Sequence, residues 1–195
     1  MNFYKLETGQ CVDKAGVAYH PEVSWKLEGE AFDAGFLQGG GPIDVAGLPH
    51  LFGKRPKGAG RNHEPDAFQI LGPWVIFSTR LKDVLTAVAD GYVQFAPFEI
   101  RSHDSKDIQD GYFAVRIVHR VSCVDRVRST VWDDDWKPRI NGTFNLNDPV
   151  VYSLSAMADY PILTTQENFG FLVREDVKEA IDQFAGLNFT QVLTS

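Results

Sequence analysis

The sequence is poor in the features that mark several large classes of protein. It has two cysteines in 195 residues, Cys11 and Cys123, which are too few for a disulfide framework. No apolar run approaches the roughly 20 residues that cross a bilayer. The N-terminus shows neither the basic start nor the apolar stretch of a signal peptide. We therefore expect a globular cytoplasmic protein that does not act in a membrane.

Motifs that carry catalysis are also missing. The sequence contains no Gly-x-Ser-x-Gly nucleophile elbow, and the glycines at 39–41 are not followed by the Gly-Lys-Ser/Thr of a phosphate-binding loop. Cys123 falls on the inward face of a predicted strand, which favours an inert buried thiol. From the sequence we therefore expect no catalytic residue and no cofactor. We expect a protein that is not an enzyme.

Two histidine clusters are the exceptions that keep an enzymatic alternative open. His63 and Glu64 lie near Asp66, and His103 adjoins Asp104. A catalytic zinc site needs about three well-placed nitrogen, oxygen or sulfur ligands. Neither cluster has a His-x-x-x-His spacing or a cysteine pair, and both fall in predicted loops. We expect no metal, and a hydrolase built on either cluster is the alternative.

Two segments 96 positions apart repeat one strand–helix–strand pattern. Each has a short apolar run, an apolar stripe at the i, i+3, i+4, i+7 spacing of a helix, a glycine, and a second extended run. The stripes are Leu81, Val84, Leu85 and Val88, then Val177, Ala180, Ile181 and Phe184. Ser78 is a plausible N-cap of the first helix. Gly91 and Gly186 follow the stripes, where a left-handed residue lets the chain turn back. The pattern fits an internal duplication or a chance similarity of two amphipathic helices.

Residues 112–125 form the clearest predicted strand, with apolar residues alternating along it. The preceding polar linker ends in Asp-Gly, so this strand is expected to pair antiparallel with the run 92–102. His119 would lie on its apolar face as a core residue. These elements predict an α+β fold, with a mainly antiparallel sheet and two short amphipathic helices.

We expect a single domain over residues 1–195. After a first strand, residues 1–65 are rich in glycine and proline, which predicts a loop-rich segment that wraps the core. Residues 66–195 would form the α+β core. The basic residues between Lys54 and Arg61 have no aromatic residues among them, so a solvated loop is favoured over a nucleic-acid contact.

The net charge of −7 is concentrated in one part of the sequence. Between Trp132 and Asp182 there are ten carboxylates against four basic residues, a net charge of −6. An acidic surface repels nucleic acid and membranes, but it attracts basic proteins and speeds their association. The alternative is ordinary solubilising charge.

Within that segment, two tryptophans enclose three consecutive acids. Tryptophan is enriched among interface hot spots, and carboxylates at a rim steer a basic partner. The predicted partner-binding surface therefore consists of Trp132, Asp133, Asp134, Asp135, Trp136, Asp159, Tyr160 and Glu167. The alternative places Trp132 in the core above the sheet, with Asp135 as a helix or turn cap.

Several segments together resemble a bacterial immunity-protein family of polymorphic toxin systems, first described as a domain of unknown function from myxobacteria. They are the apolar strand and short helix at 75–85, the Phe-x-Pro strand at 94–100, the Gly-Tyr strand at 111–118, and the final helix and Phe strand at 171–192. The resemblance covers residues 70–192 and not the first 65.

The resemblance implies a protein without catalytic residues that binds a cognate toxin and blocks its active site. Because toxins that attack nucleic acids carry basic clefts, we expect a 1:1 complex with a nuclease, such as a DNase, from a contact-dependent or type VI secretion system. An adaptor or chaperone that carries an effector without inhibiting it is the alternative.

Overall fold

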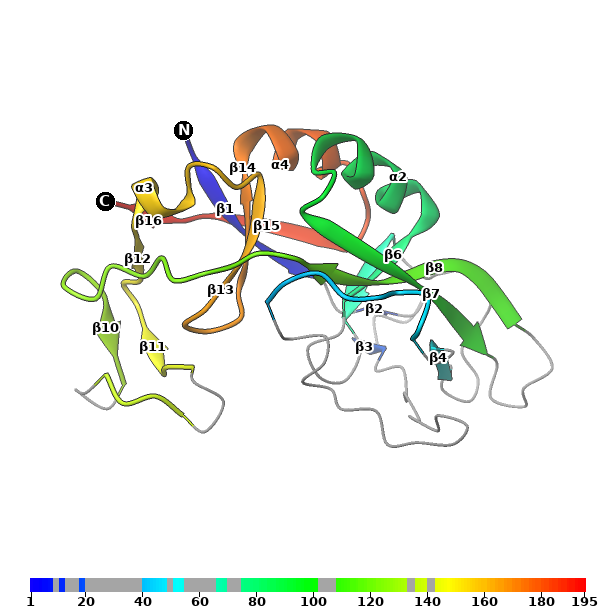
Figure 1. Ribbon diagram of the computed structural model, residues 1–195, viewed down its shortest axis with the longest axis horizontal. Helices are drawn as coiled ribbons and strands as arrows, with labels where there is room; N and C mark the ends of the chain where they lie inside the picture. Colours follow the sequence, from blue (N-terminus) through cyan, green and yellow to red (C-terminus); the bar gives the residue numbers. More distant parts are fainter. Residues whose placement is uncertain are drawn as a thin grey trace.

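Two five-stranded sheets lie end to end beneath a pair of helices (Figure 1). The computed structural model describes residues 1–8, 11–12, 18–19, 40–48, 51–54, 66–69, 75–101, 108–132, 136–139 and 143–195. The α+β fold class, with mainly antiparallel pairing, is confirmed.

The first sheet has the strand order β4-β7-β8-β6-β5. Its strands are β4 (Leu51–Lys54), β5 (Ala67–Gln69), β6 (Val75–Ser78), β7 (Val93–Arg101) and β8 (Ile108–Ile117), and helix α2 (Thr79–Val88) follows β6. The Ser78 hydroxyl accepts from the Leu81 N–H at 3.3 Å, so Ser78 caps the helix as predicted. The antiparallel pairing of β7 with β8 is also as predicted.

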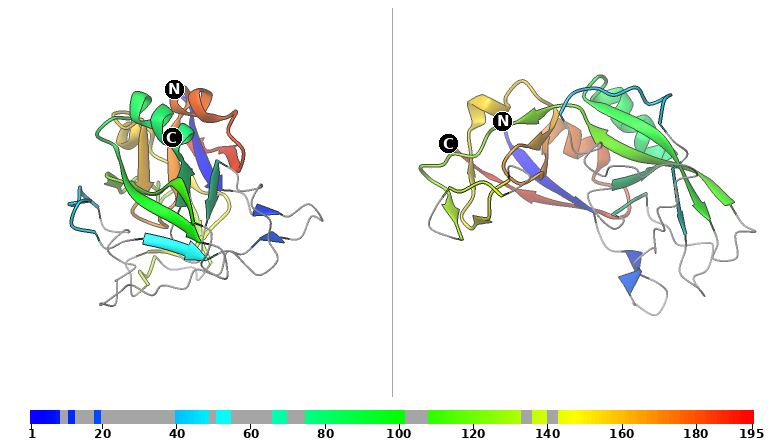
Figure 2. Two further views of the ribbon diagram at one scale, coloured as in Figure 1. Left: turned by 90° about the vertical axis from the view of Figure 1, so that its right-hand side faces the viewer. Right: turned by 60° about the horizontal axis from the view of Figure 1, so that its bottom comes forward.

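The second sheet has the order β15-β1-β14-β13-β9. Its strands are β1 (Phe3–Thr8), β9 (Arg120–Val121), β13 (Ile162–Thr165), β14 (Phe171–Arg174) and β15 (Leu187–Gln191), and helix α4 (Glu175–Ile181) follows β14. The remaining elements are β2 (Cys11–Val12), β3 (Ala18–Tyr19), β10 (Thr130–Val131), β11 (Leu146–Asn147), β12 (Val151–Tyr152), α3 (Leu154–Met157) and β16 (Leu193–Thr194). Both chain ends lie at the same end of the molecule (Figures 1 and 2).

The sequence repeat corresponds to a structural repeat larger than the two predicted units. In one sheet β8 lies between β6 and β7, and in the other β1 lies between β14 and β15. The registers also agree: Val115 faces Val75 and Phe95, and Leu6 faces Phe171 and Phe189. The second sheet thus takes its central strand from the N-terminus of the chain, which the sequence pattern did not reveal.

Further details of the repeat extend beyond the central strands. The parallel pair β4–β7 has its counterpart in the parallel pair β12–β16. The Ser78 N–H donates to the Asp66 carbonyl at 2.7 Å, and the Arg174 N–H donates to the Pro161 carbonyl at 2.9 Å at the corresponding place. Gly91 (φ 77°) and Gly186 (φ 92°) both adopt the left-handed conformation expected after each helix.

The two helices pack against each other and against one face of both sheets (Figures 1 and 2). Leu81, Leu85, Val177 and Ile181 are fully buried in a core that also contains Leu6 and Val115. Val88, the last residue of the first stripe, is the exception, with 39% exposure. This core joins both sheets, which supports the proposal of a single domain.

The predicted strand over 112–125 is not continuous. β8 ends at Ile117, and after Val118 and His119 the chain enters the second sheet as β9. His119 lies at this crossing and is half-buried rather than in the core, so its predicted place was wrong. An alternating apolar pattern does not show where a chain changes sheets, because both strands keep the same period.

Residues 40–48 cross the face of the first sheet opposite helix α2. The buried Arg116 guanidinium donates from Nε and Nη2 to the Gly41 carbonyl at 3.0 and 2.8 Å. The Gln94 side chain both accepts from and donates to the backbone of Ile43, and Val45 and Leu48 pack on the apolar residues beneath. Within the predicted wrapping segment, these residues do lie over a sheet.

Candidate protein-binding surface

A two-stranded extension projects from the second sheet between β9 and β12. We call its described residues, 125–132, 136–139 and 143–149, the extension; they include the β10–β11 pair and lie at the lower left of Figure 1. The Trp132 N–H donates to the Asn145 carbonyl at 2.9 Å, and the Arg139 N–H donates to the Thr143 carbonyl at 2.7 Å. These bonds hold the two arms of the extension together.

Glu167 anchors the extension to the sheet. Its side chain is buried, and its carboxylate accepts from the Ser122 hydroxyl at 2.6 Å and from the Cys123 N–H at 3.4 Å. Its backbone carbonyl accepts from the Phe144 N–H at 2.7 Å. Because Glu167 is 1% exposed, it cannot contact a partner in this structure, although the sequence placed it on the binding surface.

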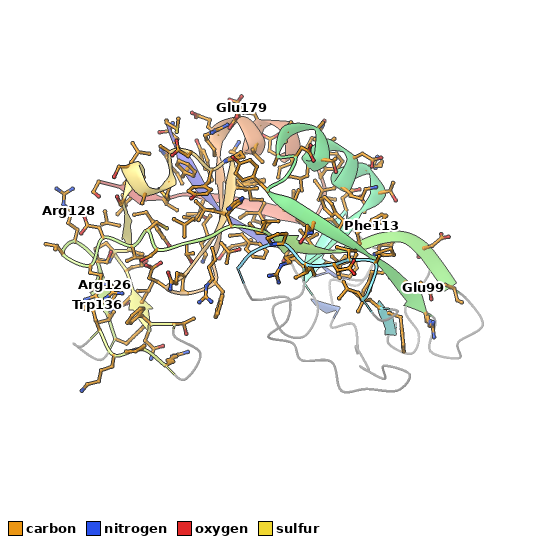
Figure 3. All side chains as sticks on the ribbon, in the orientation of Figure 1. Glu99, Phe113, Arg126, Arg128, Trp136 and Glu179 are labelled. Atoms are coloured by element: carbon orange, nitrogen blue, oxygen red, sulfur yellow. The ribbon has the colours of Figure 1, made fainter. Side chains whose placement is uncertain are left out.

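An aromatic and cationic stack stiffens the base of the extension. Trp136 meets Phe144 edge to face, with ring centroids 5.4 Å apart. The Arg126 guanidinium lies over both rings, 5.4 Å from the Trp136 centroid and 4.7 Å from that of Phe144. Figure 3 shows Arg126 and Trp136 together in this part of the molecule. Trp136 is half-buried and packs toward the core, which makes it a supporting residue of the surface.

Trp132, at the other end of the acidic triplet, points into solvent. Its exposed fraction is 69%, so the alternative that placed it in the core is wrong. Trp132 directly follows β10, and tryptophan is enriched among interface hot spots, so its exposure is compatible with the predicted binding surface. Asp133, Asp134 and Asp135 lie outside the described residues, and their part in the surface stays a prediction.

Asp159 and Tyr160 belong to a separate place, where the two sheets meet. Tyr160 contacts His119 and Tyr92, with ring centroids 5.3 and 6.4 Å away, and Tyr92 contacts His119 at 5.0 Å. The Tyr92 hydroxyl donates to the Asp159 carbonyl at 3.4 Å. Asp159 is exposed, and Tyr160 is half-buried. The residues of the predicted surface therefore lie in two separate places. One is the extension, and the other is the cluster of aromatic rings formed by Tyr92, His119 and Tyr160.

The carboxylates of the acidic segment do not share one face. Glu167 is buried, whereas Asp176 accepts from Arg174 at 2.7 Å and Asp182 accepts from Lys178 at 3.1 Å on helix α4. Glu179 is exposed on the same helix, far from the extension (Figure 3). Acidic residues that are close in sequence thus lie on different faces, so the sequence overestimated the negative charge of any one surface.

The family of the chain is decided by comparison with known families. The model of the immunity protein family Imm11 matches residues 4–192. The chain belongs to the Imm11 family. No curated protein matches it. The sequence resemblance is confirmed, but its assumed limit was wrong, because the match begins at residue 4 and includes the N-terminal segment. Membership implies a toxin-inhibiting immunity function.

Of the residues behind the enzymatic alternative for this Imm11 protein, the structure describes Asp66, whose carboxylate has structural partners. The Asp66 carboxylate accepts from the Ser78 hydroxyl at 2.7 Å and from the Arg80 guanidinium at 2.9 Å. Its expected companions His63 and Glu64, like His103 and Asp104, lie outside the described residues. Within the described parts of the chain, no group of three His, Cys, Asp or Glu residues is placed to hold a metal ion.

The buried thiol of this Imm11 protein lies in an environment that suppresses its reactivity. Burial, reinforced by the negative charge of Glu167, raises the pKa of Cys123 to about 12. Burial, followed by the charge of Cys123, raises the pKa of the nearby Tyr152 to about 12 as well. A nucleophile needs a lowered pKa, so Cys123 has the opposite of the environment that catalysis requires. None of the described helices is long and apolar enough to span a bilayer.

The sequence did not predict the exposed turn between Asp125 and Ser129, at the start of the extension. Arg126, Val127 and Arg128 are all exposed, and Val127 reaches 95% exposure. The available signal was an Asp after a strand, which is typical of a turn. That signal does not distinguish a functional turn from an ordinary one.

Proposed function

We propose that this protein binds a nuclease toxin, such as a DNase, in a 1:1 complex in the cytoplasm and blocks the toxin's active site. The toxin would belong to a contact-dependent or type VI secretion system. Family membership implies that the protein inhibits a toxin. What we add is the kind of toxin that it binds. The inhibitor would act by binding alone, without chemistry of its own.

The observation that carries the proposal is the exposed Trp132 beside three consecutive acids on a braced extension. Anionic groups of an inhibitor can compete with phosphates for a basic cleft. Asp133, Asp134 and Asp135 supply such charge, while Trp132 supplies apolar contact area. The bond from Trp132 to Asn145 and the contact of Trp136 with Phe144 fix the residues on either side of the triplet.

The first experiment is to co-express the chain with the product of its neighbouring gene, scoring survival and co-purification. We expect rescue together with a stable complex. Co-purification with a partner that is harmless alone would favour the adaptor, and absence of both binding and rescue would contradict the proposal. In that case the histidine clusters would be tested next.

The second experiment reverses the charge of the acidic triplet with Asp133→Lys, Asp134→Lys and Asp135→Lys. We expect the association rate constant to fall at least tenfold at low salt, because charges steer encounter more than they slow dissociation. Asp83→Lys, Asp90→Lys and Glu179→Lys form the matched control, with the same charge change on exposed residues of the helix layer. Equal kinetics of the two triple variants would remove the loop from the interface.

A further inference from the structure

The outer edge of β15 is an open side of the second sheet. β15 pairs with β1, and no other described strand of this sheet pairs with it. The Val192 N–H donates to the Phe3 carbonyl at 3.1 Å, and these two residues continue the β1–β15 register. Because hydrogen-bonded pairs alternate along an antiparallel ladder, the backbone N–H and C=O groups of Leu187, Phe189 and Gln191 point away from β1. Figure 2 shows β15 on the outside of its sheet.

The structural repeat provides a matched edge in the first sheet, where β7 takes the place of β15. In both repeats a parallel strand, β4 or β12, covers the last part of this edge. The Val118 N–H donates to the Tyr92 carbonyl at 2.9 Å, so the same alternation points Pro97 outward, and the aligned registers place it where β15 has Gln191. A proline has no N–H to offer a further strand. β15 keeps every outward N–H, whereas β7 lacks one.

The composition of β15 leaves its edge unprotected. The sequence Leu-Asn-Phe-Thr-Gln contains neither a charge nor a proline, and with five residues β15 is longer than the other edge strands of the two sheets, β4, β5 and β9. Natural edge strands are commonly short, charged or interrupted by proline, because an open edge pairs with other chains. Leu187 and Phe189 are only half-buried, so apolar surface is left for a neighbouring strand.

A second copy of the chain fits this edge because β15 is complementary to itself. When two β15 strands run antiparallel about a twofold axis at Phe189, Leu187 of each copy lies opposite Gln191 of the other. In this register all the outward backbone groups are paired. Asn188 of each copy then lies opposite Thr190 of the other, so the two strands bring no like charges together.

We propose that two copies of this chain associate through β15 and form one continuous sheet across the dimer. The charges beside the edge are paired within the chain. Lys178, 5.7 Å from the centroid of the Phe189 ring, binds Asp182 at 3.1 Å, and on β1 Lys5 forms an ion pair with Glu7. The edge therefore offers no excess negative charge to a basic toxin, whereas it matches a second copy. Symmetric dimers are also the commonest oligomers of soluble proteins.

The test measures the mass of the purified 195-residue chain by light scattering over a range of concentrations. We expect a dimer. Gln191→Pro should raise the dimer dissociation constant by about tenfold or more, because it removes one N–H from each copy at the interface and no hydrogen bond to β1. Gln191→Ala is the matched control, since it shortens the same side chain but keeps the N–H, and it should remain dimeric.

Two double variants test the register of the paired strands. Asn188→Lys with Thr190→Lys would place ammonium groups opposite each other across the axis and should weaken the dimer by about fivefold. Asn188→Lys with Thr190→Glu would place opposite charges there and should restore wild-type affinity. Thermal unfolding verifies that each variant is folded.

A wild-type chain that stays monomeric at every concentration would overturn the proposal. A dimer that Gln191→Pro and the double Lys variant leave unchanged would also overturn it. If the wild type is monomeric and Gln191→Pro instead weakens binding to the product of the neighbouring gene, the edge belongs to the toxin and not to a second copy. Because the mass measurement uses this chain alone, its result does not depend on the proposed function.

Discussion

Replacing Glu167 with alanine tests whether this residue is an anchor of the fold rather than part of the interface. The substitution removes the acceptor of the Ser122 hydroxyl and the weaker acceptor of the buried Cys123 N–H. Ser122 is exposed and can bond to water instead, whereas Cys123 is 2% exposed. An unsatisfied buried donor costs about 1–3 kcal/mol, and a lost hydrogen bond to a charged group costs about 1.5–3 kcal/mol. Partial replacement by water reduces their sum, so we expect a loss of about 3 kcal/mol.

The assay is urea and thermal unfolding followed by circular dichroism. In a protein of this size, 1 kcal/mol lowers the Tm by about 2–4 °C, so Glu167→Ala should lower it by about 6–12 °C. Glu167→Gln, which keeps the shape and one acceptor oxygen, should lose less. Glu179→Ala is the control, because exposed substitutions usually change stability by less than about 0.5 kcal/mol. A Glu167→Ala protein as stable as this control would refute the anchoring role.

Three other predictions concern the scaffold. Leu81→Ala should cost about 2–5 kcal/mol in urea unfolding, because Leu81 is fully buried between the sheets and helices, and a loss under 1 kcal/mol would contradict that packing. Ser78→Ala should cost about 1 kcal/mol through loss of the helix cap, with Thr86→Ala as an exposed control in the same helix. Because the folded pKa of Cys123 is raised, the stability it contributes is complete below about pH 9 and is lost as the pH rises toward about 12. In a Cys11→Ser background the native thiol should therefore resist alkylation at pH 8, and rapid labelling would disprove its burial.

Helices α2 and α4 could be predicted because their signals are local, whereas the short helix α3 was not predicted. The apolar stripes, the Ser78 cap and the glycines at 91 and 186 each lie within a few residues of the element they define. The antiparallel pairing of β7 with β8 was accessible for the same reason, since the two strands are adjacent in sequence. Local propensity and tertiary packing agree in these segments.

The place of β1 could not be predicted, because its pairing with β14 and β15 joins the two ends of the chain. Likewise, the apolar pattern does not mark the crossing at Val118, where the chain passes from the first sheet to the second. The candidate surface was found only in part. Trp132 is exposed as an interface residue must be, but the role of Glu167 depends on bonds to Ser122 and Phe144, which lie far from it in sequence.

The most direct test is an inhibition titration of the purified toxin from the neighbouring gene, with double-stranded DNA cleavage as the readout. We predict that cleavage falls in proportion to added protein and stops at one equivalent. The charge-reversed triplet of residues 133–135 should require more protein to reach the same inhibition. Undiminished DNA cleavage with the wild-type protein in tenfold excess would contradict the proposal that this protein inhibits a DNase.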